Sequence, residues 1–351
     1  MTDFLAAQYP LLAIRLQKQA LADLPTPVSI VRFDTSDGAR SISVKHDDVS
    51  NPQYGGNKIR KLEYVLHRAG ERGARRIATF GTVGSNHALA TALFATKSGF
   101  ECTCFLEHQK RTPNISKTLN MHRRIGTEIV RIGHGVDRVA TLRRYLHGRR
   151  SWVVPLGGSS WLGAVGFVNA GLELASQVAS GDIPAPDRIY IAMGTMGSSV
   201  GLALGIALAE LPAELHVVRV VDDMFANPRA FKRLIRKTTL MMNRLDPSIP
   251  DDLWERTRLC WRDSFFGKGY AVSDSTTATA VARARTELGL SLEPTYTGKA
   301  MAALLRDLES QEYAGEKCLF WNTYNSRPLP VTDEKPATAD NIPDDFMRYF
   351  D

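Results

Sequence analysis

The chain has 351 residues and a formal net charge of +7, from 44 lysine and arginine residues against 37 aspartate and glutamate residues. This length is ample for two domains, each with its own core. No apolar run approaches the ~20 residues of a membrane-spanning helix, and the N-terminus lacks the features of a signal peptide. The four cysteines show no spacing typical of a disulfide framework or a zinc site, so we expect a cytoplasmic protein without a metal.

The positive charge does not by itself indicate a nucleic-acid partner. Much of the excess lies in four arginine pairs that we expect on solvated helix faces: Arg75-Arg76, Arg123-Arg124, Arg143-Arg144 and Arg149-Arg150. Aromatic residues do not interleave with these arginines as they do on surfaces that bind nucleic acids. A positive field also attracts an anionic cofactor and an amino-acid substrate. We therefore expect a small-molecule partner and no nucleic acid.

After a short amphipathic helix expected within residues 1–21, the first informative segment is Asn51–Leu66, NPQYGGNKIRKLEYVL. Gly55 and Gly56 lack a Cβ atom, so the backbone can pass close to a flat ligand. Apolar residues at helical spacing then predict a helix that begins near Asn57. Such a helix fixes the origin of the lysine side chain that follows.

That lysine, Lys58, is a candidate for covalent amine catalysis. Burial and the neighbouring cations Arg60 and Lys61 would lower its pKa, as such an amine requires. The alternative is a surface turn that leads into an amphipathic helix.

Two later segments share one pattern, in which a buried strand leads through a glycine-bearing loop into a helix. In the first, the three parts are Ile77–Phe80, Gly81–Ser85 and Asn86–Ser98. In the second, they are Ile189–Met193, Gly194–Ser199 and Val200–Leu211. Strand and helix patterns keep alternating through ECTCFLE, TEIVRI, SWVVPL and LHVVRVV, which predicts an α/β fold with mostly parallel sheets.

The loop Gly194–Ser199, GTMGSS, is a predicted anion site. Bare N–H groups, hydroxyl groups and the dipole of the following helix all favour a phosphate there. The loop lacks the ending of a Walker P-loop and the glycine spacing of a dinucleotide fingerprint, and a tight turn without a ligand is the alternative. A phosphate site, the Lys58 amine and Asn86 as a partner for a ring hydroxyl together meet the needs of pyridoxal 5'-phosphate (PLP).

Five motifs, in the same order, resemble those of fold-type-II PLP enzymes, specifically the family of D-cysteine desulfhydrase and 1-aminocyclopropane-1-carboxylate (ACC) deaminase. They are LADLPTPVSIV, GGNKIRKLE, GSNHALATA, PLGGSSWLGAVGFVNAGLEL and YTGKAMAALL, and they extend the match from about residue 21 to 327. The resemblance implies two α/β lobes of the tryptophan synthase β-like type, with PLP in the cleft between them. It also implies a larger lobe of residues 1–56 and 166–351, a smaller inserted lobe of residues 57–165, and a homodimer.

The resemblance assigns a role to each matching residue. It implies that Lys58 is the Schiff-base lysine and that Lys61 lies near the phosphate. The expected phosphate loop comprises Gly194, Thr195, Met196, Gly197 and Ser198. The expected substrate-binding residues are Ser85, Asn86, His87, Gly158 and Tyr296, and the expected catalytic residues are Lys58, Ser85, Tyr270 and Tyr296. For the two tyrosines, the residues alone favour half-buried packing against a strand.

Two positions bear on the reaction through the pyridine nitrogen of the cofactor. A carboxylate beside that nitrogen keeps it protonated, whereas a hydroxyl leaves it largely neutral. Where the deaminase pattern has glutamate and leucine, this chain has Thr297 and Thr323, as in the desulfhydrase pattern. The resemblance therefore implies a PLP-dependent lyase that catalyses α,β-elimination from a small amino acid such as D-cysteine, with pyruvate, ammonia and sulfide as products.

The segment Asn322–Arg327 departs from the histidine-threonine-glycine-glycine run of the family. Tyr324 and Asn325 replace small glycines, so we expect a more crowded floor beneath the cofactor ring. Ring opening of ACC, β-replacement and racemisation remain as alternative reactions. A PLP-binding protein without catalysis is an alternative of another class, and a basic nucleic-acid-binding protein would show steeply salt-dependent binding.

Overall fold

The structure is a computed structural model that describes residues 3–35, 38–133, 136–148, 150–310, 313, 315–329 and 342–350. Within these ranges the chain forms two compact units. Unit 1 contains residues up to 16, 22–61 and 159–327, and unit 2 contains 17–21, 62–158 and the residues after 327. This division departs from the expected lobes, because 57–61 and 159–165 belong to unit 1 whereas 17–21 and 342–350 belong to unit 2.

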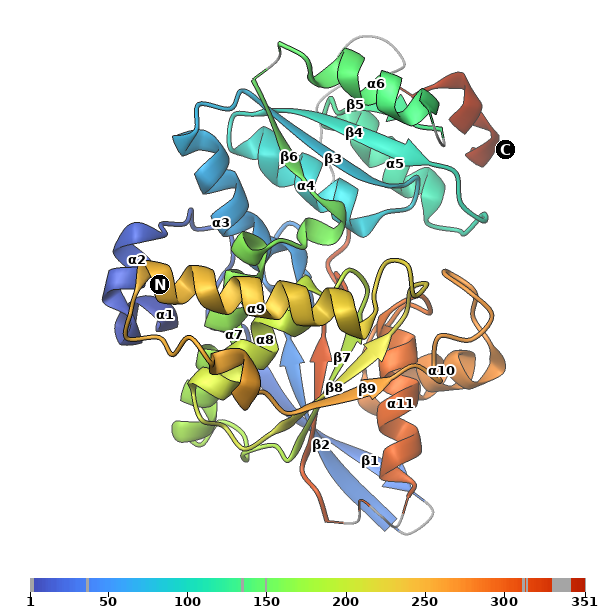
Figure 1. Cartoon of the computed structure of the whole chain (residues 1–351). Helices are drawn as coiled ribbons and strands as arrows, with labels where there is room; N and C mark the ends of the chain where they lie inside the picture. Colours follow the sequence, from blue (N-terminus) through green and yellow to red (C-terminus); the bar gives the residue numbers. More distant parts are fainter. Residues whose placement is uncertain are drawn as a thin grey trace. The chain divides into compact units, whose positions relative to one another are not determined.

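Unit 1 is built on a sheet whose described strands have the order β1-β2-β10-β7-β8-β9 (Figure 1). All neighbouring strands are parallel except the hairpin of β1 and β2. The strands are β1 (Val28–Thr35), β2 (Gly38–His46), β7 (Arg188–Met193), β8 (Glu214–Arg219), β9 (Leu259–Arg262) and β10 (Cys318–Asn322). Parallel strands bring their carboxyl ends to one edge, which is where ligands bind in open α/β sheets.

Helices cover both faces of this sheet. One group comprises α7 (Trp161–Ala179), α8 (Gly197–Leu208) and α9 (Pro228–Leu245), and the other α10 (Ser275–Leu288) and α11 (Thr297–Leu308). Trp321 of β10 contacts Phe167 of α7, whereas Tyr190 of β7 donates to Asp307 of α11 at 2.7 Å. Tyr190 pairs with Phe320, the neighbour of Trp321, and successive strand residues point to opposite faces. The two helix groups therefore lie on opposite faces.

Small residues allow α7 and α8 to pack closely. A Cβ atom on Gly201 would lie 2.0 Å from the carbonyl oxygen of Ala164, and one on Gly205 would lie 2.4 Å from that of Val168. A similar contact fixes the start of α3 (Lys58–Glu71) in unit 1, because a Cβ atom on Gly166 would lie 2.1 Å from the carbonyl oxygen of Arg60. Glycine is thus required at these three positions.

Unit 2 contains a parallel sheet with the order β5-β4-β3-β6 among its described strands. The strands are β3 (Arg76–Thr82), β4 (Glu101–Glu107), β5 (Glu128–Arg131) and β6 (Ser151–Val154), and the helices α4 (Asn86–Lys97), α5 (Ile115–Arg124) and α6 (Val136–Leu146) belong to the same unit. Near the C-terminus, the 3-10 helix η5 (Asp344–Tyr349) buries Phe346 and Tyr349. Both rings contact His108, so this part of the tail belongs to the core of unit 2.

The mixed α/β architecture with mostly parallel sheets confirms the predicted fold class. Two details differ from the sequence expectation. The N-terminal helix is divided into α1 (Phe4–Gln8) and α2 (Pro10–Arg15), because the proline at position 10 begins a new helix. The predicted loop Gly194–Ser199 ends earlier than expected, since Gly197–Ser199 already form the first turn of α8.

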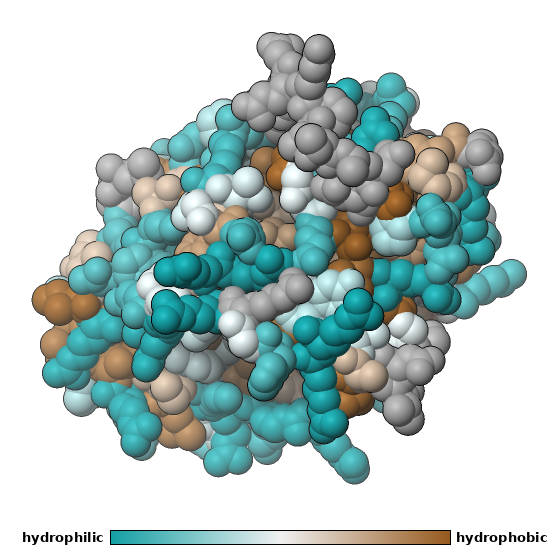
Figure 2. All heavy atoms as spheres, turned by 90° about the horizontal axis from the view of Figure 1, so that it is seen from above, coloured by the Kyte–Doolittle hydropathy of each residue, from teal (hydrophilic) through white to brown (hydrophobic). Residues whose placement is uncertain are grey.

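The surface and the helix lengths agree with the composition. On the face shown in Figure 2, hydrophilic side chains predominate and hydrophobic ones are scattered among them. Among the described residues, no helix is both long and apolar enough to span a membrane.

Candidate active site

Lys58 is the first residue of α3, and two glycines place it there. A Cβ atom on Gly55 would lie 1.8 Å from the carbonyl oxygen of Asp48. Gly56 has a φ of +101°, and a Cβ atom there would lie 3.1 Å from the carbonyl oxygen of Thr323. Larger residues would therefore displace the backbone, and the glycine pair of the motif fixes the origin of the lysine.

A chain of hydrogen bonds joins Lys58 to the predicted phosphate loop. The Nζ atom of Lys58 donates to Oδ1 of Asn57 at 2.6 Å, and Nδ2 of Asn57 donates to Oγ of Ser198 at 2.9 Å. The backbone N–H of Asn57 donates to the carbonyl oxygen of Thr323 at 3.1 Å. Asn57 thus connects the starts of α3 and α8 with the end of β10.

Burial lowers the pKa of Lys58 to about 8, although the Glu293 carboxylate acts in the opposite direction. The pKa of the buried Lys61 lies well below its ordinary value, first because of burial and second because of Lys58. Lysine amines with a pKa near neutrality can serve as nucleophiles and bases. The sequence leaves the pKa of Lys58 open, and in the folded chain burial lowers it.

Arg60 has a different role from the one expected, because its guanidinium is paired. It donates to Asp47 at 2.8 Å and to Glu173 at 2.9 Å, with all three side chains buried. Lys45 also contacts Glu173, at 2.5 Å. Despite burial, Arg60 and then Lys45 lower the pKa of Glu173 to about 2. This cluster of Lys45, Asp47, Arg60 and Glu173, the buried ionic cluster, anchors the helix that carries Lys58.

The N-terminus of α8 suits an anion. Its N-cap residue, Met196, has a φ of +70°, and its own side chain makes no capping hydrogen bond, so we call this end of α8 the uncapped helix start. The N–H of Gly197 donates to Oγ of Ser159 at 3.0 Å. The buried Oγ of Ser199 has no hydrogen-bond partner in the described part of the chain. The N–H groups of the first turn, an unsatisfied hydroxyl and the Lys58 amine linked through Asn57 fit the phosphate of PLP.

The two predicted tyrosines lie together. The hydroxyl groups of Tyr270 and Tyr296 are 2.7 Å apart, and their rings pack edge to face at 6.0 Å. A Cβ atom on Gly194 would lie 3.4 Å from the ring of Tyr296, so this tyrosine borders the phosphate loop. Burial and then Tyr270 raise the pKa of Tyr296 well above its ordinary value. The phenol of Tyr296 is therefore placed to hold its proton rather than to ionise.

Thr297, the first residue of α11, is fully buried and contacts Glu293. The Oγ1 atom of Thr297 accepts the backbone N–H of Glu293 at 3.2 Å. Thr323 is buried and follows Asn322, which is also buried. The side-chain amide nitrogen and oxygen of Asn322 lack hydrogen-bond partners among the described residues. A buried amide without partners is costly, so this end of β10 has unused capacity to bind a ligand.

The remaining predicted residues belong to unit 2. Oγ of Ser85 caps α4 by accepting the N–H of Ala88 at 3.2 Å, and Asn86 is the first residue of that helix. The ring nitrogens of the buried His87 face hydroxyls of its own unit, with Nε2 lying 2.9 Å from Oγ1 of Thr79. Gly158 ends a 3-10 helix and has a φ of +65°. Their roles toward a substrate stay predictions.

Three polar residues of this region have no role in the sequence prediction: Asn57, Glu293 and Asn322. Asn57 precedes Lys58 directly, and Asn322 precedes Thr323, so adjacency to a motif residue was the available signal. Glu293 lies three residues before Tyr296, the N-cap residue of α11, so its contacts could not be read from the sequence.

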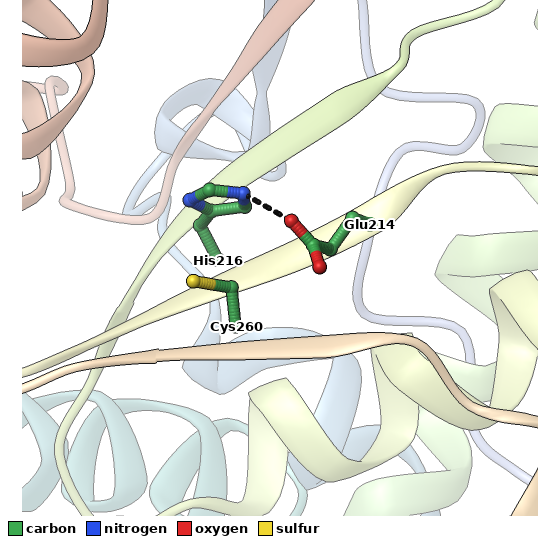
Figure 3. A group of neighbouring side chains, drawn as sticks. All are labelled: Glu214, His216 and Cys260. Carbon is green, nitrogen blue, oxygen red and sulfur yellow. Dashed lines mark hydrogen bonds and ion pairs between the residues drawn. The ribbon is translucent and has the colours of Figure 1, made fainter. Parts of the chain in front are cut away.

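Three side chains of types that can bind a metal lie together at the start of β8 and β9. Glu214, His216 and Cys260 bring ligand atoms within 4.8 Å of one another (Figure 3). Arg262 donates to Nδ1 of His216 at 2.9 Å, so Nε2 carries the proton and donates to Glu214 at 2.8 Å. A metal would require that nitrogen without its proton. We therefore assign these side chains to a hydrogen-bonded cluster.

Comparisons with known proteins show the family of this chain. The family model described as "Pyridoxal-phosphate dependent enzyme" matches residues 20–323. The D-cysteine desulfhydrase of Yersinia pestis (strain Pestoides F) is 32% identical over 283 residues, which cover 78% of this chain and 83% of the relative. That of Salmonella choleraesuis (strain SC-B67) is 31% identical over 309 residues, which cover 85% and 90%. The crystal structure of an ACC deaminase homologue has a TM-score of 0.72 at 25% identity and covers 92% of this chain and 95% of that one.

The fold and these similarities define the class of protein, a fold-type-II PLP enzyme. The chain belongs to the family of pyridoxal-phosphate dependent enzymes. Its cofactor is PLP, and it is a lyase.

Proposed function

We propose that this lyase catalyses α,β-elimination from a small β-substituted amino acid, with D-cysteine as the best candidate. The products would be pyruvate, ammonia and sulfide. The hydrogen-bonded chain from Lys58 through Asn57 to Ser198 carries the proposal, because it joins an amine of lowered pKa to an uncapped helix N-terminus. The similarity to two desulfhydrases supports the substrate.

The residues of unit 1 suggest a division of labour. When bound, PLP withdraws electrons from Cα of the substrate and so weakens its Cα–H bond. The pKa of Lys58 is about 8, so part of this amine is neutral at a pH near 8. The neutral amine can take the Cα proton. The hydroxyl pair of Tyr270 and Tyr296 can donate a hydrogen bond that stabilises the charge of the leaving thiolate. Lys61 and the first turn of α8 would hold the phosphate, and Thr297 and Thr323 would lie at the ring nitrogen.

Product analysis of the purified holoenzyme tests this proposal. We expect equal amounts of pyruvate and sulfide from D-cysteine, and a loss of about 10²–10⁴-fold in turnover for Lys58→Ala, as for removal of a general base. Lys97→Ala, which removes an exposed lysine of α4, is the matched control. Full turnover in the Lys58→Ala variant would contradict the assignment of Lys58.

Two other outcomes have specific support. Ring opening of ACC would yield a four-carbon keto acid, and the similarity to an ACC deaminase homologue favours testing it. Binding of PLP without turnover would fit the altered segment after β10, where Oδ1 of Asn325 accepts the N–H of Gly55 at 2.6 Å. A panel of D- and L-amino acids with ACC separates elimination, ring opening, β-replacement, racemisation and mere binding.

We also propose that the enzyme acts in the cytoplasm as a homodimer. Its four cysteines are free thiols, which suits a reducing compartment. The family resemblance supports the dimer, and light scattering on the purified protein measures it directly.

A further inference from the structure

The carboxylate of Glu293 accepts backbone N–H groups at the start of α11. Oε1 accepts the backbone N–H groups of Tyr296 at 2.7 Å and Thr297 at 2.9 Å, and Oε2 accepts that of Thr295 at 2.7 Å. These contacts fix the carboxylate beside two residues of the candidate site. They also place it 3.4 Å from the hydroxyl oxygen of Thr297.

Glu293 therefore constrains the hydrogen bonds that the hydroxyl of Thr297 can make. Oγ1 accepts the N–H of Glu293 at 3.2 Å and lies 3.4 Å from both the carbonyl oxygen and Oε1 of Glu293. A hydroxyl has one hydrogen and two lone pairs. When its hydrogen points at the ionised carboxylate, the second lone pair is left to accept a hydrogen bond. When Glu293 is neutral, the same hydrogen is released for donation elsewhere.

Several charged or titratable groups surround Glu293. Lys58 of α3, Tyr296 and Lys299 of α11 and Tyr324 after β10 all interact with it electrostatically. Burial raises the pKa of Glu293, and its backbone hydrogen bonds act in the opposite direction. Burial thus favours the neutral carboxyl group, whereas the three backbone N–H groups favour the ionised one.

We propose that Glu293, acting through the hydroxyl of Thr297, sets the protonation of the pyridine nitrogen of PLP. This inference rests on the proposed function, in which Thr297 lies at that nitrogen. An ionised Glu293 makes Thr297 an acceptor and so favours a protonated ring, which is the stronger electron sink. Thr297 therefore does not leave the ring nitrogen neutral, because the carboxylate of Glu293 lies next to its hydroxyl group. Glu293 is a positioning residue, since it acts on the ring through Thr297.

The test uses holoenzyme loaded with PLP that carries ¹⁵N in its ring, because the ¹⁵N chemical shift reports protonation directly. At a fixed pH we expect Glu293→Gln to lower the ratio of protonated to neutral ring about tenfold, since a nearby opposite charge shifts a pKa by about 1–3 units. In a Thr297→Ala background, the same substitution should have no further effect. Glu287→Gln on α10 removes an exposed carboxylate that pairs with Arg283; it is the matched control and should match the wild type.

An unchanged ¹⁵N shift in Glu293→Gln, or an equal change with and without Thr297, would overturn the inference. Thermal unfolding of the apoprotein shows whether the variant folds. If it does not, comparing the pH titration of the ring signal in wild type and Thr297→Ala decides the question: a titration step present in the wild type and missing in the variant is expected, and identical curves would overturn the proposal. Failure of the wild type to bind PLP would instead contradict the proposed function.

Discussion

The two strand–loop–helix segments of this chain look alike in sequence, yet their helix starts differ. At the end of β3, Oγ of Ser85 caps α4 by accepting the N–H of Ala88. At the end of β7, α8 starts from the left-handed Met196, whose side chain makes no capping hydrogen bond. Ser159, from outside this loop, accepts only one N–H of the helix start, that of Gly197, and Oγ of Ser199 has no partner among the described residues. One helix start is thus satisfied by its own loop, whereas the other keeps capacity for an anion. The glycine pattern predicts both turns, but capping decides which can bind phosphate.

The largest effect is expected from the buried ionic cluster, which anchors α3 next to the uncapped helix start. Glu173→Gln leaves Arg60 and Lys45 buried with one carboxylate fewer. Loss of one partner of a buried pair costs about 3–5 kcal/mol, and urea unfolding of the apoprotein measures this. A change below about 1 kcal/mol would show that the cluster does not stabilise the fold, given that even exposed pairs contribute up to this amount.

The same cluster predicts a pH dependence. Because the pKa of Glu173 is depressed from 4.5 to about 2, its stabilisation is fully present above pH 4.5 and is lost as the pH falls toward 2. The stability difference between wild type and Glu173→Gln should shrink in this window. A constant difference from pH 6 to 3 would contradict the depressed pKa.

The next effect concerns the reactivity of the Lys58 amine, which Asn57 connects to the uncapped helix start. With a pKa of about 8, Lys58 reacts with the aldehyde of PLP as the neutral amine. The rate of covalent reconstitution of apoprotein should therefore fall roughly 100-fold from pH 9 to 6 and level off above about pH 8. Stopped-flow absorbance measures this rate. A rate that still rises tenfold per unit up to pH 10 would indicate an ordinary lysine.

Ser199→Ala tests the uncapped helix start directly. A lost hydrogen bond to a charged phosphate costs about 1.5–3 kcal/mol, which corresponds to PLP binding weakened by roughly 10–100-fold. The stability of the apoprotein should stay the same or rise slightly, because a buried hydroxyl without a partner is removed. Fluorescence titration with PLP and thermal unfolding measure the two quantities. Unchanged affinity for PLP together with a less stable apoprotein would show that the hydroxyl of Ser199 stabilises the fold and does not bind phosphate.

Ser85→Ala is the matched change at the capped helix and has the smallest expected effect. Loss of an N-cap side chain costs about 1 kcal/mol, so unfolding of the apoprotein should show this decrease. Stabilisation of the apoprotein by inorganic phosphate should equal that of the wild type. A loss of phosphate binding would place the anion at α4 and break the comparison.

The sequence predicts the parts of the site that depend on residue type and local order. Lys58, the glycine pair before it and the strand before α8 are of this kind. Gly197–Ser199 were assigned to the loop because glycine and serine are weak helix formers, whereas close packing of α8 on α7 makes them helical. The pairing of Arg60 was missed because Glu173 lies 113 residues away. The unsatisfied Ser199 hydroxyl and the reach of Glu293 likewise depend on the folded chain.

The central claim is that the cofactor is bound covalently at the start of α3 with its phosphate at the uncapped α8. Borohydride reduction of the PLP-loaded enzyme, followed by mass spectrometry of its peptides, tests this most directly. The account predicts the phosphopyridoxyl group on Lys58, with strongly reduced labelling in Ser199→Ala at limiting PLP. Labelling of Lys61 or of a lysine outside this region, with Lys58 unmodified, would contradict it.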